Sequence, residues 1–154
     1  MKSNKNIIIL KNNYSLKFKE FNFKCSIGKR GLAANKIEGD NKTPKGLFKL
    51  GNLYYRKDRV KKPTTSLICK AIKPSMRWCN DITNVKYYNK LVNNNNVKSE
   101  KLCRNDYKYD YLIVINFNIE KKIVGKGSAI FIHLTQNYKP TAGCVALSRK
   151  DFLI

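Results

Sequence analysis

Two residues that together can carry out acyl transfer lie close to each other near the end of the chain. His133 is the only histidine and follows an apolar run, and Cys144 comes eleven residues later, directly after a glycine. A cysteine attacks a carbonyl carbon as the thiolate, and an imidazole within hydrogen-bond reach lowers the pKa of the thiol and accepts its proton. Cys144 is therefore a candidate nucleophile and His133 its candidate base.

The residues just before Cys144 strengthen this interpretation. The segment 140–143 reads Pro-Thr-Ala-Gly, which is typical of a tight turn whose backbone approaches another group closely. A glycine in front of a nucleophile leaves room for a substrate carbonyl, and the N–H groups of Gly143 and Cys144 are candidate oxyanion donors. The competing interpretation is a buried structural cysteine and a structural or merely exposed histidine, which are common roles for both residue types.

The elements expected around this pair are short strands. The apolar run Ala129–Ile132 predicts a strand with His133 at its exit, a usual place for a catalytic side chain on a rigid scaffold. The β-branched and aromatic run 111–117 predicts another strand, with 119–124 as its pairing partner. Ser148-Arg149-Lys150-Asp151 resembles a capping box that opens a helix.

The first half of the chain also reads as strands joined by turns. The apolar run 7–10 predicts one strand, and the alternation over 16–27 predicts another, with a bulge or break where the pattern slips at Glu20 and Phe21. Turn signals at 28–31, 39–40 and 44–46 precede a predicted strand over 47–50. Between Tyr87 and Leu102 we expect a short helix followed by the polar loop 93–96.

Length and composition indicate one folded domain. The chain has 154 residues and a hydrophobic fraction of 42%, which excludes a disordered protein and leaves no room for two domains. The predicted final helix reaches only about one turn, and such a short helix does not propagate alone. We therefore expect the single domain 1–154 to be cut short at its C-terminus. The apolar stretch 7–10 is too short for a signal peptide or a membrane span.

The charge balance has two explanations. The chain carries 32 Lys and Arg against 10 Asp and Glu, a formal net charge of +22. This potential attracts polyanions such as nucleic acid, anionic lipid or an acidic cell-wall polymer. However, Lys, Asn and Ile are frequent throughout, as expected from biased genome composition, and the basic residues are scattered singly rather than gathered on one helix.

Cysteine spacing argues against metal and against a disulfide framework. The five cysteines have no Cys-x-x-Cys spacing, and a single histidine is available to help them; they are Cys25, Cys69, Cys79, Cys103 and Cys144. We expect no metal site and no cofactor. The odd count leaves at least one thiol free and is compatible with one or two bridges.

The residues around the candidate pair match a known family. Phe131-Ile132-His133 followed by the segment 141–147, Thr-Ala-Gly-Cys-Val-Ala-Leu, resembles the YkuD-type L,D-transpeptidases, bacterial enzymes with a His and then a Ser/Thr-x-Gly-Cys signature. Upstream segments resemble the spaced motifs of a short, single-domain branch of this family: Glu38-Gly39-Asp40, Thr43-Pro44-Lys45-Gly46, Tyr55-Arg56-Lys57-Asp58-Arg59, Trp78-Cys79-Asn80-Asp81 and Arg104-Asn105-Asp106-Tyr107. The chain departs from many members at Ala142 and Ala146 and in its shorter spacing from His133 to Thr141.

The resemblance implies a fold and a reaction. The fold is a mainly β, YkuD-like sandwich or partly open barrel of short strands with one or two short helices. Cys144 would be the nucleophile and His133 the proton acceptor, with the Gly143 and Cys144 N–H groups holding the oxyanion and Thr141 shaping the turn. The substrate would be a peptidoglycan stem peptide that loses a terminal D-alanine, which implies the periplasm or cell envelope as the location. No signal peptide is visible, so a cytoplasmic location stays open as the alternative.

Three further residues occupy family motif positions and are expected to line the cleft: Trp78, Asp81 and Arg104. The structural alternative is a core tryptophan and an Asp/Arg pair that fixes a loop. Two functional alternatives also stay open. One is a cysteine carboxypeptidase or amidase with water as acceptor, and the other is a basic nucleic-acid-binding module, for which Tyr107-Lys108-Tyr109 is the best candidate. The oligomeric state is not indicated.

Overall fold

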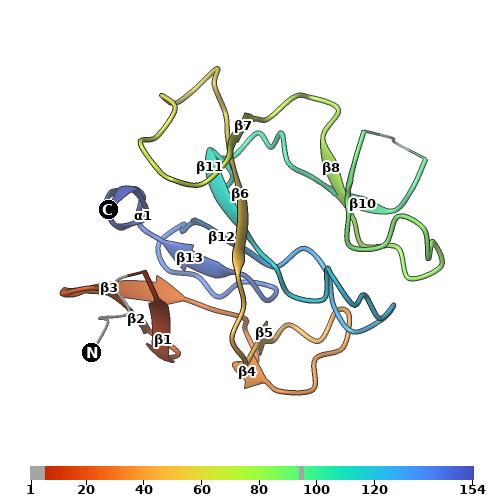
Figure 1. The fold of residues 1–154 in the computed structure, drawn as a ribbon, viewed down its shortest axis with the longest axis horizontal. Coiled ribbons are helices and arrows are strands. Elements are labelled where there is room, and N and C mark those ends of the chain that lie inside the picture. Colours follow the sequence, from red (N-terminus) through yellow and green to blue (C-terminus); the bar gives the residue numbers. More distant parts are fainter. Residues whose placement is uncertain (1–5, 94–95) are drawn as a thin grey trace.

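A computed structural model describes residues 6–93 and 96–154, which fold mainly as β-strands (Figure 1). The largest sheet has eight strands in the order β1-β2-β3-β13-β12-β11-β6-β7. Their bounds are β1 (Ile8–Asn12), β2 (Ser15–Phe18), β3 (Phe21–Ser26), β13 (Val145–Leu147), β12 (Phe131–Leu134), β11 (Tyr111–Ile115), β6 (Leu50–Tyr55) and β7 (Cys69–Ala71). β1 and β7 form the two edges of this sheet and do not pair with each other, so the sheet does not close into a barrel.

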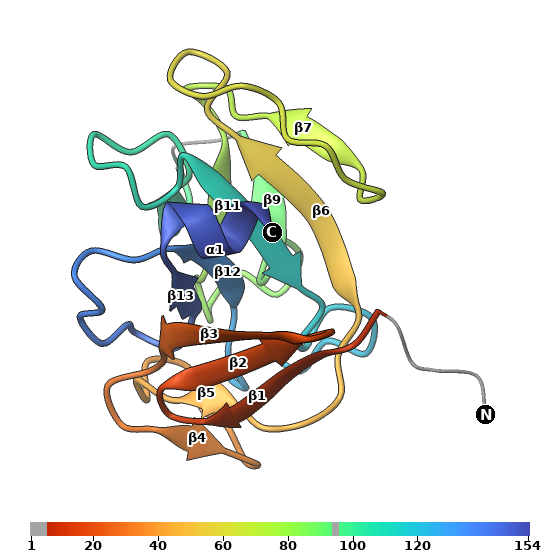
Figure 2. The same ribbon diagram turned by 90° about the vertical axis from the view of Figure 1, so that its left-hand side faces the viewer.

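Two small sheets and one helix complete the described part of the chain. The three-stranded sheet has the order β10-β8-β9 and the two-stranded sheet pairs β4 with β5; the bounds are β10 (Ser99–Lys101), β8 (Arg77–Cys79), β9 (Leu91–Val92), β4 (Leu32–Ala33) and β5 (Thr43–Pro44). The helix α1 (Arg149–Leu153) lies above the β1–β3 strands in Figure 2. The prediction of a mainly β fold is confirmed.

The pairing of β12 with β13 decides which residues share a face. The two strands run parallel with Ile132 opposite Val145 and His133 opposite Ala146. Since side chains alternate along a strand, Cys144 lies on the same face as Ala146 and therefore on the same face as His133. The opposite face carries Ile132, which packs in an apolar cluster under β2 and β3.

Several element predictions are confirmed. The pattern slip near Glu20 is a break, because β2 ends at Phe18, β3 begins at Phe21 and Lys19 takes a left-handed φ of 53° between them. The capping box is also present, since the Ser148 side chain accepts a hydrogen bond from the Asp151 amide at 3.1 Å.

Four predictions are wrong. The strand expected over 47–50 begins only at Leu50, and Leu47 is 91% exposed, so it has no burial to hold it in a sheet. Residues 119–124 do not pair with β11, whose neighbours are β6 and β12; the Asn118 side chain instead closes a turn with Ile123. His133 lies inside β12, not at its exit.

The fourth wrong prediction is the short helix between Tyr87 and Leu102. This stretch forms β9 and β10, which flank β8, so pairing with β8 takes the place of local helix formation. Residues 94 and 95 of the predicted polar loop lie outside the described residues. Across the described ranges, no helix has the length and apolar character needed to cross a membrane.

Candidate active site

A cavity of about 390 Å³ opens on the sheet face that carries Cys144 and His133, and both residues line it. Its walls come mainly from three parts of the chain, and Asn80 and residues 128–130 and 135–136 complete them. The first is β12, β13 and the turn 139–143, the second is the loop 36–41, and the third is the segment 100–109. The sheet register and this cavity together bring the predicted Cys/His pair into one site.

Cys144 lies at the inner wall of the cavity. Its Sγ is 3.3 Å from the Phe131 amide, which donates to it, and 3.3 Å from the Ala129 carbonyl oxygen, to which the thiol donates. The side chain is only 8% exposed, and burial raises the pKa of the thiol to about 12 because a thiolate loses its hydration there. In the resting site Cys144 is therefore a neutral thiol, held by two backbone groups.

His133 is also neutral in the resting site. Burial lowers the pKa of its imidazole to about 4, and the nearby positive charges of Lys108 and Arg104 act in the same direction. Nδ1 lies 2.9 Å from the Leu134 carbonyl oxygen, which can only accept, so Nδ1 carries the proton. The other ring nitrogen, Nε2, is then unprotonated and able to take a proton from a donor in the cavity.

The turn before Cys144 is fixed by a second residue that the sequence singled out. The Thr141 hydroxyl donates to the Cys144 carbonyl oxygen at 2.6 Å and accepts from the Gly143 amide at 3.1 Å. The second of these bonds occupies the Gly143 N–H, which is one of the two groups expected to hold an oxyanion. The Cys144 N–H is therefore the better candidate for that role. Thr43 adds a support from outside the turn by donating to the Gly143 carbonyl oxygen at 2.7 Å.

Gly143 cannot be replaced without moving this turn. Its φ of 148° is rare for residues with a side chain, and a Cβ would lie 2.9 Å from the Lys42 carbonyl oxygen and 3.3 Å from the Ile130 side chain. The expectation from sequence that the backbone comes close to another group at this point is confirmed.

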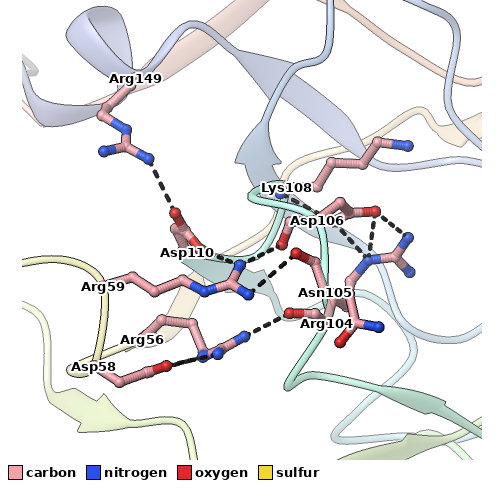
Figure 3. A network of polar contacts seen from close by, with 9 residues as sticks. All are labelled: Arg56, Asp58, Arg59, Arg104, Asn105, Asp106, Lys108, Asp110 and Arg149. Atoms are coloured by element: carbon pink, nitrogen blue, oxygen red, sulfur yellow. Dashed lines mark hydrogen bonds and ion pairs between the residues drawn. The ribbon is translucent and has the colours of Figure 1, made fainter.

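The third wall of the cavity is held from behind by arginines (Figure 3). Arg56 donates to the Arg104 carbonyl oxygen at 2.6 Å, and Arg59 donates to the carbonyl oxygens of Asn105 and Asp106 at 3.1 and 2.9 Å. Asp110 pairs with Arg59 at 3.4 Å and with Arg149 of α1 at 2.9 Å. These contacts fix the backbone of 104–110 relative to the sheet.

The front of the same wall carries a network of partly buried polar groups around Tyr109. The Tyr109 ring packs edge-on against the His133 ring with centroids 5.2 Å apart, and its hydroxyl donates to Glu100. Arg104 lies over the Tyr109 ring at 5.1 Å and pairs with Asp106 at 2.6 Å. Arg104 thus lines the cavity as predicted, and it also orders the residues that position His133.

Trp78 and Asp81 are not among the described residues that line the cavity. Trp78 is buried, its Nε1 donates to the Asn89 side chain at 2.8 Å, and its ring packs edge-on against Phe131. Asp81 caps a turn by accepting from the Thr83 amide and hydroxyl. Trp78 thus has the core position that the sequence left as its alternative. Asp81 has a structural contact too, but with Thr83 and not with an arginine, since Arg104 pairs with Asp106.

Sequence reasoning missed several residues of the cavity wall, among them Lys36, Glu100 and Tyr109. Tyr109 was singled out only as part of a possible nucleic-acid contact. Lys36 stands two residues before the Glu38-Gly39-Asp40 motif, which was the available signal for it. Glu100 has no local signal, because it reaches the site only through the pairing of β10 with β8.

Comparison with known proteins agrees with this geometry. The model of the YkuD family, described as the L,D-transpeptidase catalytic domain, matches residues 2–153, which is nearly the whole chain. No curated protein and no solved structure matches the chain significantly. A family match over almost the full length, together with a cavity lined by the signature His and Cys, leads to one conclusion: this chain belongs to the YkuD family of L,D-transpeptidase catalytic domains.

Proposed function

We propose that the protein carries out cysteine-dependent L,D-transpeptidation of peptidoglycan stem peptides, with Cys144 as nucleophile and His133 as proton acceptor and donor. The observation that carries this proposal is the β12–β13 register, which puts both side chains on one face of the sheet and on the wall of one cavity. Such chemistry belongs at the cell wall, and we propose the cell envelope as the place where the protein acts.

In the first step the donor carbonyl, which precedes a terminal D-alanine, enters beside Cys144. The thiol proton moves to Nε2 of His133 as the Sγ–C bond forms, because the resting pair is neutral and the thiolate is needed only at the moment of attack. The Cys144 N–H faces the developing oxyanion. The C–N bond then breaks, the leaving D-alanine amine takes the proton from His133, and a thioester remains on Sγ.

In the second step an amine of another stem peptide attacks the thioester. His133 accepts a proton from this amine, the C–N bond forms, and Sγ leaves and regains the proton. Water in place of the amine gives hydrolysis and a trimmed stem. The four cationic side chains on the cavity wall fit a substrate rich in carboxylates; they are Lys36, Arg104, Lys108 and Lys139.

The test is to incubate the protein with a tetrapeptide stem ending in D-alanine, with and without an amine acceptor, and to weigh protein and products. We expect a transient adduct equal to the donor minus D-alanine, no adduct in Cys144→Ala, and a cross-linked product when the amine is present. A trimmed tripeptide as the only product would make the protein a carboxypeptidase. Neither adduct nor product, together with tight, salt-sensitive oligonucleotide binding, would overturn the proposal in favour of a nucleic-acid-binding module.

A further inference from the structure

A buried cation, Lys36, lies beside the candidate nucleophile, and neither the family signature nor the steps proposed above give it a role of its own. Lys36 is only 4% exposed, although lysine is among the residue types least often fully buried. It lies on the cavity wall. Its ammonium is close to the Cys144 turn: a Cβ built on Gly143 would be 3.7 Å from Lys36 Nζ.

The surroundings of Lys36 fix its ammonium but do not use all of its protons. Nζ donates to Asp40 at 2.7 Å and to the Ile37 carbonyl oxygen at 3.4 Å. The stem of the side chain lies against Gly127, where a Cβ would be only 3.0 Å from Lys36 Cε. An ammonium has three N–H donors, so the bonds within this loop leave one for a ligand in the cavity.

The negative charge of Asp40 is shared with other donors. Besides Lys36, Asp40 accepts from the amides of Ile37 and Lys42, each at 2.9 Å. These hydrogen bonds and Lys36 together lower the pKa of the Asp40 carboxyl, so it is ionised at neutral pH. Because the two amides already compensate part of this charge, Lys36 retains attraction for a second anion.

The wall of the cavity also has polar atoms without partners. Within the described part of the chain, Asn80 Oδ1, Ser128 Oγ and Thr135 Oγ1 are buried and make no hydrogen bond, and all three residues line the cavity. Ser128 is only 6% exposed and follows Gly127, against which the Lys36 stem packs. Buried polar atoms are nearly always paired, so this wall is suited to a polar ligand.

We propose that Lys36 and Ser128 form a subsite that binds the terminal carboxylate of the donor peptide, next to the bond that is cleaved. This inference rests on the proposed function. The carboxylate carbon of a C-terminal residue is three bonds from the scissile carbonyl carbon, at about 1.33, 1.46 and 1.52 Å each. The cation that recognises it must therefore lie almost beside the nucleophile, as Lys36 does.

Two other cations on the cavity wall, Arg104 and Lys108, act on a different residue. Arg104 and Lys108 exert their charge on His133, whereas Lys36 acts on Cys144. Arg104 is also committed to Asp106 and Glu100. Binding of the terminal carboxylate by Lys36 puts the leaving residue on the Lys36 side of Cys144, and the subsite then selects donors that end one residue beyond the scissile bond with a free carboxylate.

The experiment compares two tetrapeptide donors that differ only at the terminus, D-alanine carboxylate or D-alanine carboxamide. For the unaltered protein we expect kcat/KM to be about 10- to 100-fold higher for the carboxylate, the usual value of a hydrogen bond to a charged group. Lys36→Met should reduce this ratio to within about threefold, chiefly through the carboxylate donor, and Ser128→Ala should reduce it partly. Equal rates for both donors in the unaltered protein would overturn the subsite while leaving the proposed function in place.

Two controls separate recognition from structure. Lys62→Met removes an exposed lysine that does not line the cavity, and should leave the ratio unchanged. Asp40→Asn removes the ion-pair partner but keeps the ammonium, and should preserve the preference for carboxylate. If Lys36 has only a structural role, Lys36→Met and Asp40→Asn will lower the rates with both donors alike, and the subsite is refuted.

If neither donor reacts, the proposed function fails, and binding of the two peptides then tests separately whether the carboxylate subsite exists. Equilibrium binding of the two peptides to the unaltered protein and to Lys36→Met, followed by calorimetry, then replaces the rates. A preference for the carboxylate that disappears in Lys36→Met supports the subsite, and equal affinity of the two peptides for the unaltered protein refutes it.

Discussion

The eight-stranded sheet carries a buried cysteine on each of its two faces, and only one of the two is a candidate nucleophile. Cys25 on β3 pairs with Leu147 of β13, and so lies on the face opposite to Cys144. Both thiols are nearly inaccessible, at 2% and 8% exposed, and burial raises the pKa of both, to about 11 and about 12. Burial and a raised thiol pKa therefore do not by themselves distinguish a candidate nucleophile from a structural cysteine.

The difference lies in the neighbours. Cys25 packs in an apolar cluster with Leu16, Phe23 and Ile132. Cys144 lines a cavity together with a histidine that has a free ring nitrogen, and two backbone groups hold its sulfur. Reactivity at a buried thiol therefore requires a proton acceptor and space for a substrate, which one face of this sheet supplies.

The largest effect is expected from removing the Cys144 thiol, with removal of the Cys25 thiol as the matched control. Cys144→Ala should lower kcat by at least roughly 10³-fold and abolish the covalent adduct with a carbapenem seen by intact mass. Cys25→Ala should leave the adduct and kcat within about twofold and reduce the free energy of unfolding by about 1–2 kcal/mol, since it removes packing from a core. An adduct that persists in Cys144→Ala and disappears in Cys25→Ala would reverse the comparison.

The second prediction concerns the base, which only the Cys144 face has. The pKa of His133 is about 4 when folded and about 6.5 when unfolded, so the unfolded chain binds more protons between these values. The stabilisation that comes from the low pKa of His133 is fully present above pH 6.5 and is lost as the pH falls toward 4. Between pH 7 and pH 4 the protein should lose about 3 kcal/mol more unfolding free energy than His133→Gln, by denaturant titration.

The carboxylates of the unaltered protein and of His133→Gln titrate in the same pH range. Only the difference between the two curves of unfolding free energy against pH therefore reports on His133. Parallel curves would mean that the imidazole is accessible to protons in the folded state, and that the neutral resting pair is wrong.

The smallest of the three effects is expected at the turn. Gly143→Ala should lower kcat/KM about 10- to 100-fold, because a Cβ meets the Lys42 carbonyl and displaces the Cys144 backbone from the site. Gly31→Ala is the matched control: Gly31 also has a left-handed φ, of 79°, but a Cβ there meets nothing within 4 Å. Gly31→Ala should lower the free energy of unfolding by about 1–2 kcal/mol and leave kcat/KM unchanged. Equal kinetic losses in both variants would show that strain, and not displacement of the turn, limits activity.

Local sequence was sufficient for the parts of the site that depend on neighbouring residues. The turn at Gly143 and the cap at Ser148 follow from residue types whose backbone preferences are strong. Patterns of apolar residues located β1, β2, β3, β11 and β12, but they misplaced the strands expected over 47–50 and 119–124 and gave no signal for the short strands such as β8 and β13. An apolar run forms a strand only where another strand is available to pair with it, and a short strand is held by its partner more than by its own sequence.

Contacts between distant residues decided the rest. The parallel register of β12 and β13 put His133 and Cys144 on one face. The arginine network behind residues 104–110, together with the hydrogen bond from the Leu134 amide to the Lys108 carbonyl oxygen, holds Tyr109 against His133. The sequence by itself determined which residues could do the chemistry, through their types and a family signature. The tertiary structure decided which of them share a cavity, and it set their pKa values, because burial and distance depend on segments far apart in the chain.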